Sequence, residues 1–392
     1  MPIVVQKYGG SSVADVEKIR KVARKVKARR EEGFQLVVVV SAMGDTTDEL
    51  LSLAKQVSKD PPRRELDMLL SCGERISMAL LAMALFEEQV PSISFTGSQS
   101  GIITDDSHAQ ARIVEVRPFR IQEALGEGKV VIVAGYQGVS YKKEVTTLGR
   151  GGSDTTAVAL AAALKADCEI YSDVDGVFSA DPRKVPDARK LDVLSYEEMQ
   201  ELAFAGARVL NAQAVEFAKE KGIVIHARST HEAGTGTSVY DVPKGVHRVK
   251  GVALEDDMVF LSARPEVLSS LVGLLAEKGI KPRSLHFESL GAEGSVFVAV
   301  PLQDVHGLDA FRTELEQKLG TRARLHEQLG SVTCVGTGIG ADFNCLQRVF
   351  GLAEQMGVPL WAAHTSWLQL SVVADKKHLA TLCRTLHAEL IG

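Results

Sequence analysis

Residues 146–157 read Thr-Thr-Leu-Gly-Arg-Gly-Gly-Ser-Asp-Thr-Thr-Ala, and this glycine-rich stretch decides the fold class. An apolar run from Val130 to Ala134 precedes it and an alanine-rich segment at 157–166 follows it, which predicts a strand, a glycine loop and a helix. The N-terminus of a helix favours an anion, because its first N–H groups are unpaired and the helix dipole is positive there. The loop is therefore predicted to bind a negatively charged group. An ordinary helix start capped by the Ser-Asp pair is the alternative interpretation.

Two charged residues of this stretch suit a ligand that carries charges of both signs. Arg150 offers a planar guanidinium that matches a carboxylate or a phosphate. Asp154 can hold an ammonium group or cap the helix.

The composition of the chain indicates a soluble globular protein. It has 392 residues, of which 45% are apolar and 24% charged, and its net charge is -5. This length predicts two or three domains, and the negative charge provides no basic surface for nucleic acid or anionic lipid. We expect no membrane partner and a cytoplasmic location, because no signal-like start and no apolar run near the roughly 20 residues of a membrane helix are present. The five cysteines are scattered and odd in number, which favours free thiols.

The start of the chain repeats the pattern of strand, small-residue turn and helix. Ile3 to Gln6 is predicted as a strand, and Lys7, Gly9 and Gly10 follow it directly. Ligands of open α/β sheets bind at this end of the strands. The spacing is not that of a P-loop, so a nucleotide would be held differently.

A second such turn follows the β-branched run from Leu36 to Val40, which is typical of a strand buried on both faces. The turn at 41–48 contains Ser41 and Thr47. The helical region at 66–88 is interrupted at 71–75, where Glu74 suggests a charge facing a pocket; a surface Glu-Arg pair is the alternative.

A third turn follows the predicted strand from Glu169 to Ser172. It contains Asp173, and Asp181 and Arg183 come soon after it. Such side chains at a strand end can hold a metal-bound phosphate, a ribose or an adenine. Acidic residues that only form turns are the alternative.

Beyond about residue 250 the pattern changes and then repeats. Two copies of a strand-helix-strand-strand-helix unit are predicted, and the echo of Leu275 to Ile280 at Leu352 to Val358 supports the repeat. No titratable cluster marks them as reactive, so we interpret them as ligand-sensing or dimerising modules. The predicted domains are 1–245, 250–325 and 326–392, with strands open to exchange between the two repeats.

The charged residues of the first domain favour phosphoryl transfer, which depends on positioning and charge neutralisation rather than on a nucleophile from the protein. A Ser-His-Asp order, a Cys-His pair, a zinc-ligand spacing and a Gly-x-Gly-x-x-Gly fingerprint after the first strand are all missing from the sequence.

Five motifs together resemble those of the aspartokinases, which are amino acid kinases with C-terminal ACT repeats. They are Lys-Tyr-Gly-Gly-Ser-Ser (7–12), Ser-Ala-Met-Gly-Asp-Thr-Thr-Asp (41–48), Leu-Gly-Arg-Gly-Gly-Ser-Asp-Thr-Thr (148–156), Ser-Asp-Val-Asp-Gly-Val (172–177) and Ala-Asp-Pro-Arg (180–183). The resemblance implies an α/β amino acid kinase fold, a mostly parallel sheet with helices on both faces, followed by two α+β ferredoxin-like ACT domains.

The resemblance also implies ATP-dependent phosphorylation of the L-aspartate β-carboxylate to 4-phospho-L-aspartate, the first step of lysine, threonine and methionine synthesis. ATP would act with Mg²⁺ and without a metal site of the protein, an amino acid effector would bind the ACT repeats, and these repeats would form a homodimer. The implied catalytic residues are Lys7, Asp154 and Arg208. Those implied to bind aspartate are Ser41, Thr47, Glu74, Arg150, Gly151, Gly152 and Ser153. Those implied to bind ATP are Lys7, Gly9, Gly10, Ser172, Asp173, Phe178, Asp181 and Arg183.

The sequence departs from the family pattern in two places. Arg208 stands where the family commonly has lysine, and the turns after the first strand of each ACT repeat lack the expected Asp-x-Pro-Gly-like form. The effector therefore stays open between lysine, threonine, both and none. A glutamate or acetylglutamate kinase and a non-catalytic amino acid sensor are the competing hypotheses.

Overall fold

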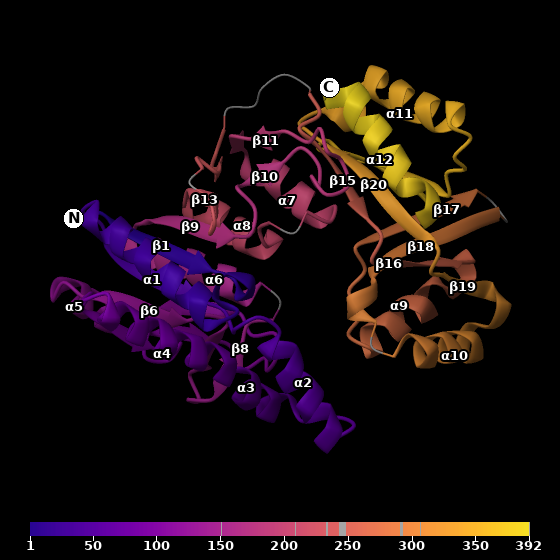
Figure 1. The fold of residues 1–392 in the computed structure, drawn as a ribbon. Coiled ribbons are helices and arrows are strands. Elements are labelled where there is room, and N and C mark those ends of the chain that lie inside the picture. Colours follow the sequence, from indigo (N-terminus) through magenta and orange to yellow (C-terminus); the bar gives the residue numbers. More distant parts are fainter. Residues whose placement is uncertain are drawn as a thin grey trace. The chain divides into compact units, whose positions relative to one another are not determined.

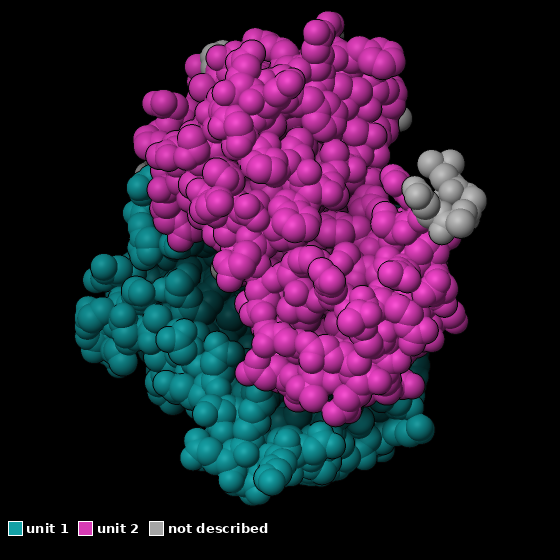
Figure 2. All heavy atoms as spheres, turned by 90° about the vertical axis from the view of Figure 1, so that its right-hand side faces the viewer, with its two compact units in different colours: residues 1–177, 190–203, 208–243 teal, residues 178–189, 204–207, 244–392 magenta. Residues whose placement is uncertain are grey.

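The computed structural model describes residues 1–149, 151–207, 209–232, 234–242, 248–290, 293–305 and 307–391. The chain divides into two compact units, which Figure 2 shows in different colours. Unit 1 comprises Met1–Val177, Lys190–Ala203 and Arg208–Pro243, and unit 2 comprises Phe178–Arg189, Phe204–Ala207 and Lys244–Gly392. The short segments 178–189 and 204–207 thus belong to the unit that is built mainly from the C-terminal part of the chain.

An eight-stranded sheet forms the body of unit 1, in the order β12-β14-β13-β9-β1-β2-β6-β3 (Figure 1). β14 runs antiparallel to β13, and all other neighbours in this sheet are parallel. This confirms the predicted mostly parallel sheet. The strands are β1 (Ile3–Tyr8), β2 (Gln35–Val40), β3 (Ser92–Phe95), β6 (Val130–Ala134), β9 (Asp167–Ser172), β12 (Val193–Leu194), β13 (Ile225–Ser229) and β14 (Thr237–Val239).

The valine-rich runs explain the central strands. β2 is buried from Leu36 to Val40, and every residue of β6 is buried. β-branched side chains fit a pleated surface, and a strand covered on both faces is apolar throughout rather than alternating. Both strands were expected from the sequence, and the structure confirms them.

Helices cover both faces of this sheet. On one face, α1 (Val16–Glu31) and α4 (Cys72–Glu87) share a core with Tyr8 of β1 and with Val38 and Val40 of β2. On the other face, α6 (Gly152–Leu164) contacts β1, β2 and β9 and packs with α8 (Ala212–Lys221). Successive side chains of a strand point to opposite faces, so Lys7 lies on the α6 side when Tyr8 lies on the α1 side.

The rest of unit 1 forms a smaller sheet and further helices. The smaller sheet has the order β5-β4-β7-β8. Its strands are β4 (Ile102–Thr104), β5 (Ile113–Val116), β7 (Gln137–Ser140) and β8 (Val145–Thr147). The other elements of unit 1 are α2 (Thr46–Val57), α3 (Arg63–Leu70), α5 (Phe119–Gly126) and the short strand β11 (Lys190–Leu191). α7 (Tyr196–Phe204) and the short strand β10 (Val177–Phe178) begin in unit 1, and the last residue of each belongs to unit 2.

The stretch Arg63–Glu87 is long and apolar enough, by length and composition alone, to cross a membrane. It consists of α3 and α4, which are separated at Ser71 where the sequence predicted a break. Half of its most apolar window is buried inside the protein, and α4 packs on β3 and β6. The charged residues Asp67 and Glu74 are buried within it. These are the features of two core helices.

Unit 2 contains two four-stranded antiparallel sheets, with the orders β17-β18-β16-β19 and β15-β20-β22-β21. The first sheet has the strand order of a ferredoxin-like fold, and the second has it with β15 in the place of the fourth strand. This agrees with the expected pair of α+β ACT domains. The elements are β15 (Gly251–Glu255), β16 (Met258–Ala263), α9 (Leu268–Glu277), β17 (Ser284–Leu290), β18 (Glu293–Pro301), α10 (Leu308–Leu319), β19 (Ala323–His326), β20 (Leu329–Val335), α11 (Phe343–Gln355), β21 (Ala362–Thr365), β22 (Gln369–Asp375) and α12 (Lys376–Ile391).

One strand of the second repeat comes from the segment that precedes the first repeat. β15 pairs with β20, so that Val252 lies opposite Cys334. The first repeat, from β16 to β19, is thus inserted between two parts of the second (Figure 1).

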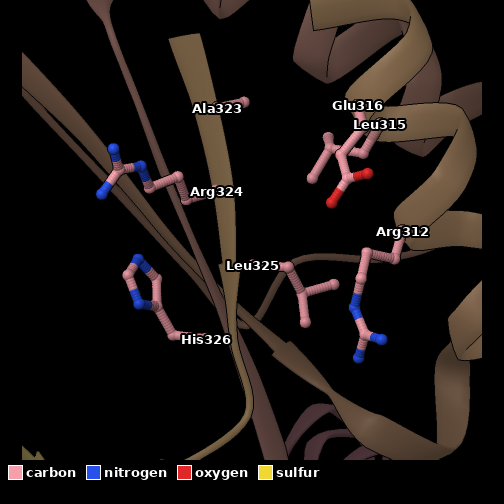
Figure 3. A pocket seen from close by; sticks show the side chains of 7 residues that line it. All are labelled: Arg312, Leu315, Glu316, Ala323, Arg324, Leu325 and His326. Atoms are coloured by element: carbon pink, nitrogen blue, oxygen red, sulfur yellow. The ribbon is translucent and has the colours of Figure 1, made fainter. Parts of the chain in front are cut away.

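A cavity of about 340 Å³ lies between α10 and the edge strand β19 of the first repeat. In Figure 3, Arg312, Leu315 and Glu316 project from α10 and Leu325 projects toward them from β19. Arg324 and His326 point to the other side of β19, as the alternation of side chains along a strand requires.

Candidate active site

The predicted site residues of unit 1 follow the carboxyl ends of neighbouring parallel strands. β9, β1, β2 and β6 are adjacent in the sheet, so their carboxyl ends meet at one edge. Ligands of open α/β sheets bind at this edge. The turns that start there are 172–176, 8–13, 41–45 and 135–136, and the glycine loop 149–151 leads into α6.

An ion pair between Lys7 and Asp154 lies at the centre of this edge. The Nζ atom of Lys7 is 2.7 Å from Oδ1 of Asp154, and the two side chains are only 14% and 10% exposed. Oδ2 of Asp154 accepts a hydrogen bond of 3.3 Å from the backbone N–H of Asn211. Two predicted catalytic residues are therefore in direct contact. The third, Arg208, lies outside the described residues.

The turn after β1 packs tightly against the turn after β2. A Cβ atom on Gly10 would lie 3.0 Å from the carbonyl oxygen of Ala42 and 3.1 Å from that of Gly44. The backbone N–H of Gly44 donates to the carbonyl of Gly10 at 3.1 Å. A Cβ atom on Gly9 would be 3.4 Å from Nζ of Lys7. Because a side chain at Gly10 would push the two turns apart, glycine is required for this close approach.

Glu74 lies in the first turn of α4 and is attached to the turn after β2. Its Oε1 accepts a 3.1 Å hydrogen bond from the N–H of Ala42, and the hydroxyl of Ser77 donates to the carbonyl of Ser41 at 2.7 Å. The Glu74 side chain is buried, and among the residues that the structure describes its Oε2 has no hydrogen-bond partner. Loss of solvation on burial raises the pKa of Glu74 to about 7, against the opposing effect of the bond from Ala42. Thr47, also predicted here, is half-buried in the first turn of α2.

The glycine loop forms the N-terminus of α6. Gly151 adopts the left-handed conformation with φ of 71°, and a Cβ atom there would lie 2.1 Å from Nδ2 of Asn211. Glycine alone satisfies both demands. Gly152, Ser153 and Asp154 form the first turn of the helix and are buried, so the anion-binding end that the sequence predicts begins at Gly152. Arg150 lies outside the described residues.

The residues predicted to bind ATP fall into two groups. Ser172 is the last residue of β9 in unit 1, next to β1, and Asp173 follows it; the N–H of Gly9 approaches the carbonyl of Tyr171 at 3.4 Å. Asp173 is exposed to solvent. Phe178, Asp181 and Arg183 belong to unit 2, and the guanidinium of Arg183 forms two hydrogen bonds to Asp181, at 3.0 and 2.9 Å. The structure thus brings residues together within each group.

The segment 178–189 is part of the hydrophobic core of unit 2. Ala180 and Val185 are buried in one cluster with residues of β15, β20 and α12. The hydroxyl of Ser179 lies 2.8 Å from Nε2 of His387 in α12, and the Ser179 carbonyl accepts a 2.7 Å bond from the N–H of Val252. The positions of Asp181 and Arg183 therefore depend on the packing of the C-terminal helix.

The family follows from comparison with known proteins. Residues 2–229 match the model of the amino acid kinase family. The aspartokinase of Mycobacterium tuberculosis (strain H37Rv) is 44% identical over 411 residues, which cover 99% of this chain and 96% of the relative. The chain belongs to the aspartokinase family.

Two crystal structures from this family share the fold over the full length of both chains. They are E. coli aspartokinase III in complex with aspartate and ADP, with a TM-score of 0.83 and 24% identity, and the same enzyme with lysine and aspartate, with a TM-score of 0.80 and 23% identity.

Three polar residues near the site were not expected from the sequence. Asn211 caps α8 through its side chain while its backbone holds Asp154, and an Asn directly before a helical stretch is a recognisable signal for a cap. Asp175 pairs with Lys190 at 2.9 Å, although beside Gly176 it resembled a turn residue. Asp67 is buried in α3, and an aspartate between apolar neighbours was the available signal.

Proposed function

We propose that the protein transfers the γ-phosphoryl group of ATP to the β-carboxylate of L-aspartate and forms 4-phospho-L-aspartate and ADP. The Lys7–Asp154 pair at the carboxyl ends of the central strands carries the proposal. Phosphoryl transfer needs a fixed positive charge beside the transferring group and little covalent chemistry from the protein. The ammonium group of Lys7, held by Asp154 next to the glycine turn, provides this charge, and Arg208 adds a second.

Aspartate binds between the glycine loop and the turn after β2. Arg150 and the N-terminus of α6, with Gly151, Gly152 and Ser153, bind a carboxylate of the substrate. Glu74 faces its ammonium group, together with Asp154, and Ser41 and Thr47 line the same cleft. The accepting β-carboxylate is ionised at pH 7, so the reaction needs no general base.

The free carboxylate oxygen of Glu74 supports this assignment. A buried polar atom without a partner costs free energy, and a ligand ammonium group supplies the missing donor.

ATP binds through Gly9, Gly10, Ser172 and Asp173 and through the segment that carries Phe178, Asp181 and Arg183. It would be used as its Mg²⁺ complex, and the ion would offset the charge of the phosphate groups. The donors present fit such an ion, because Asp173 is exposed at the end of β9 and Oδ1 of Asp175 is buried without a hydrogen-bond partner among the described residues.

The reaction is the first step from aspartate toward lysine, threonine and methionine. The two ACT domains bind an amino acid effector, and a homodimer forms through them. Titration of the activity with lysine and threonine, separately and together, identifies the effector, and light scattering gives the oligomeric state.

A coupled assay for ADP release tests the proposal. With ATP and Mg²⁺ we expect turnover with aspartate and none with glutamate or N-acetylglutamate. Turnover with glutamate or N-acetylglutamate and not with aspartate would show that the protein is a different kinase of the same fold. Binding of an amino acid without any turnover would identify a sensor.

A further inference from the structure

Asp67 is a charged residue without any exposed surface and belongs to none of the predicted site residues. It lies in α3 with 0% exposure. Oδ1 accepts a 2.6 Å hydrogen bond from the hydroxyl of Thr147 and a 3.0 Å bond from the N–H of Ala109, while Oδ2 is 2.6 Å from Nδ1 of His108. A carboxylate only accepts hydrogen bonds, so Nδ1 of His108 carries a proton. Burial of this charge is tolerated because donors surround it.

The donors to Asp67 come from two segments distant in sequence. Thr147 is the last residue of β8, directly before the glycine loop. His108 and Ala109 belong to the segment between β4 and β5, and a Cβ atom on Gly149 would lie 3.5 Å from the carbonyl of Ala109. The N–H of Ala111 donates to the carbonyl of Thr147 at 2.9 Å. The Asp67 carboxylate thus joins α3 to the segment between β4 and β5 and to the residues that lead into the glycine loop.

α3 connects this point to the second part of the aspartate site. It ends at Leu70, and the carbonyl of Ser71, at the junction with α4, accepts a 2.9 Å bond from the side chain of Gln137. α4 begins at Cys72 and carries Glu74 in its first turn. The same helix pair therefore fixes both the glycine loop, through Asp67, and the carboxylate of Glu74.

We infer that Asp67 is a positioning residue for the aspartate half of the active site. It acts through Thr147, by holding the start of the loop that carries Arg150 and Ser153 in register with Glu74. It touches neither substrate. The inference rests on the proposed assignment of these residues to aspartate. It predicts that weakening the Asp67–Thr147 contact changes aspartate binding and leaves ATP binding unchanged, because Ser172 and Asp173, which are assigned to ATP, are not among the described hydrogen-bond partners of Asp67.

The substitution Thr147→Val tests this with little change in side-chain volume, and Thr147→Ser is its matched control because serine keeps the hydroxyl. Loss of one charge-assisted hydrogen bond is expected to raise the aspartate KM of Thr147→Val about tenfold, equivalent to about 1.4 kcal/mol. The ATP KM should stay within about twofold of the wild-type value, and Thr147→Ser should restore most of the aspartate KM. Asp67→Asn, which keeps the shape of the side chain, should show the same separation of the two constants.

Thr333→Val controls for the general cost of removing a buried threonine hydroxyl. Thr333 is 3% exposed and donates to Ser371 at 2.8 Å in unit 2. Its substitution should leave both KM values unchanged. Equal rises of the aspartate and ATP KM in Thr147→Val, or an unchanged aspartate KM, would overturn the inference. Absence of aspartate turnover in the wild-type protein would instead contradict the proposed function, so the two failures are distinct.

Discussion

Replacement of Glu74 by glutamine should stabilise the protein at alkaline pH and weaken aspartate binding at the same time. Glutamine has nearly the same shape, and its side-chain oxygen can still accept the bond that the Ala42 N–H gives to Oε1. The substitution removes only the charge of a carboxylate whose Oε2 is buried without a partner among the described residues. A gain in stability accompanied by a loss of ligand binding is typical of a residue kept for function.

The size and sign of the effect follow from the pKa of Glu74, which burial raises from 4.5 to about 7. Between these two values the folded state binds more protons than the unfolded state, so the stability of the wild-type protein falls as the pH rises. The pKa difference of about 2.5 corresponds to about 3 kcal/mol at 1.36 kcal/mol for each pKa unit. Glu74→Gln should therefore gain up to about 3 kcal/mol over the wild-type protein at pH 8 and close to nothing below pH 4.5.

Hydrogen exchange of α4 is the appropriate assay, since both tryptophans, Trp361 and Trp367, lie in unit 2 and their fluorescence does not report on unit 1. Protection of α4 should be greater in Glu74→Gln than in the wild-type protein at pH 8, and nearly equal at about pH 4, below the unfolded-state pKa of 4.5. Glu198→Gln is a control, because Glu198 is also buried and also accepts a 3.1 Å bond from a backbone N–H, that of Ser195. Unlike Glu74, it has no buried oxygen without a partner among the described residues, so its substitution should not stabilise the protein. A difference between Glu74→Gln and wild type that does not change with pH would refute the argument.

Aspartate binding gives a second measurement of the same carboxyl. A ligand ammonium group favours the ionised form, so binding near pH 7 should release about half a proton from Glu74. Calorimetry in buffers of different ionisation enthalpy detects this release. Glu74→Gln should release none, and proton release that persists in this variant would show that another group titrates.

Three further substitutions test the remaining assignments. Lys7→Ala should lower kcat in the ADP-release assay by at least about 10²-fold, as expected for loss of a preorganised positive charge, while thermal unfolding shows an intact fold; retained turnover would exclude Lys7 from the reaction. Arg150→Ala should raise the KM for aspartate more than that for ATP, because the proposal assigns its guanidinium to a substrate carboxylate; an effect on ATP alone would contradict the loop assignment. Ser179→Ala removes the hydroxyl that contacts His387 and should cost unit 2 about 1 kcal/mol, measured by tryptophan fluorescence. It should also raise the ATP KM without changing the aspartate KM. Equal changes of the two KM values would show that segment 178–189 does not bind the nucleotide.

The parts of the fold that are set by local patterns could be predicted from the sequence. Apolar runs such as Leu36 to Val40 can only be buried, and small residues after them mark the carboxyl ends of parallel strands. The break between α3 and α4 was predicted at 71–75 and occurs at Ser71. The sequence allowed for an exchange of strands between the two repeats but did not show that β15 is the exchanged strand. Any apolar strand of this length can fill the fourth position of either ACT sheet. The pairing of β15 with β20 depends on contacts between residues about 80 positions apart, as with Val252 and Cys334.

The site shows the same division between local and distant information. Lys7, Glu74 and Asp154 were expected because each stands within two residues of a glycine or serine at a strand or helix end, and the structure places Lys7 and Asp154 in contact. Asp67 could not be found in this way. Its donors, His108 and Thr147, are 41 and 80 residues away. Thr147 belongs to the glycine-rich stretch 146–157, but no sequence pattern links either donor to Asp67. A buried aspartate that accepts hydrogen bonds from several segments can be recognised in the sequence only by its apolar neighbours. The role of this aspartate becomes clear only in the folded structure, where the donors lie around its carboxylate.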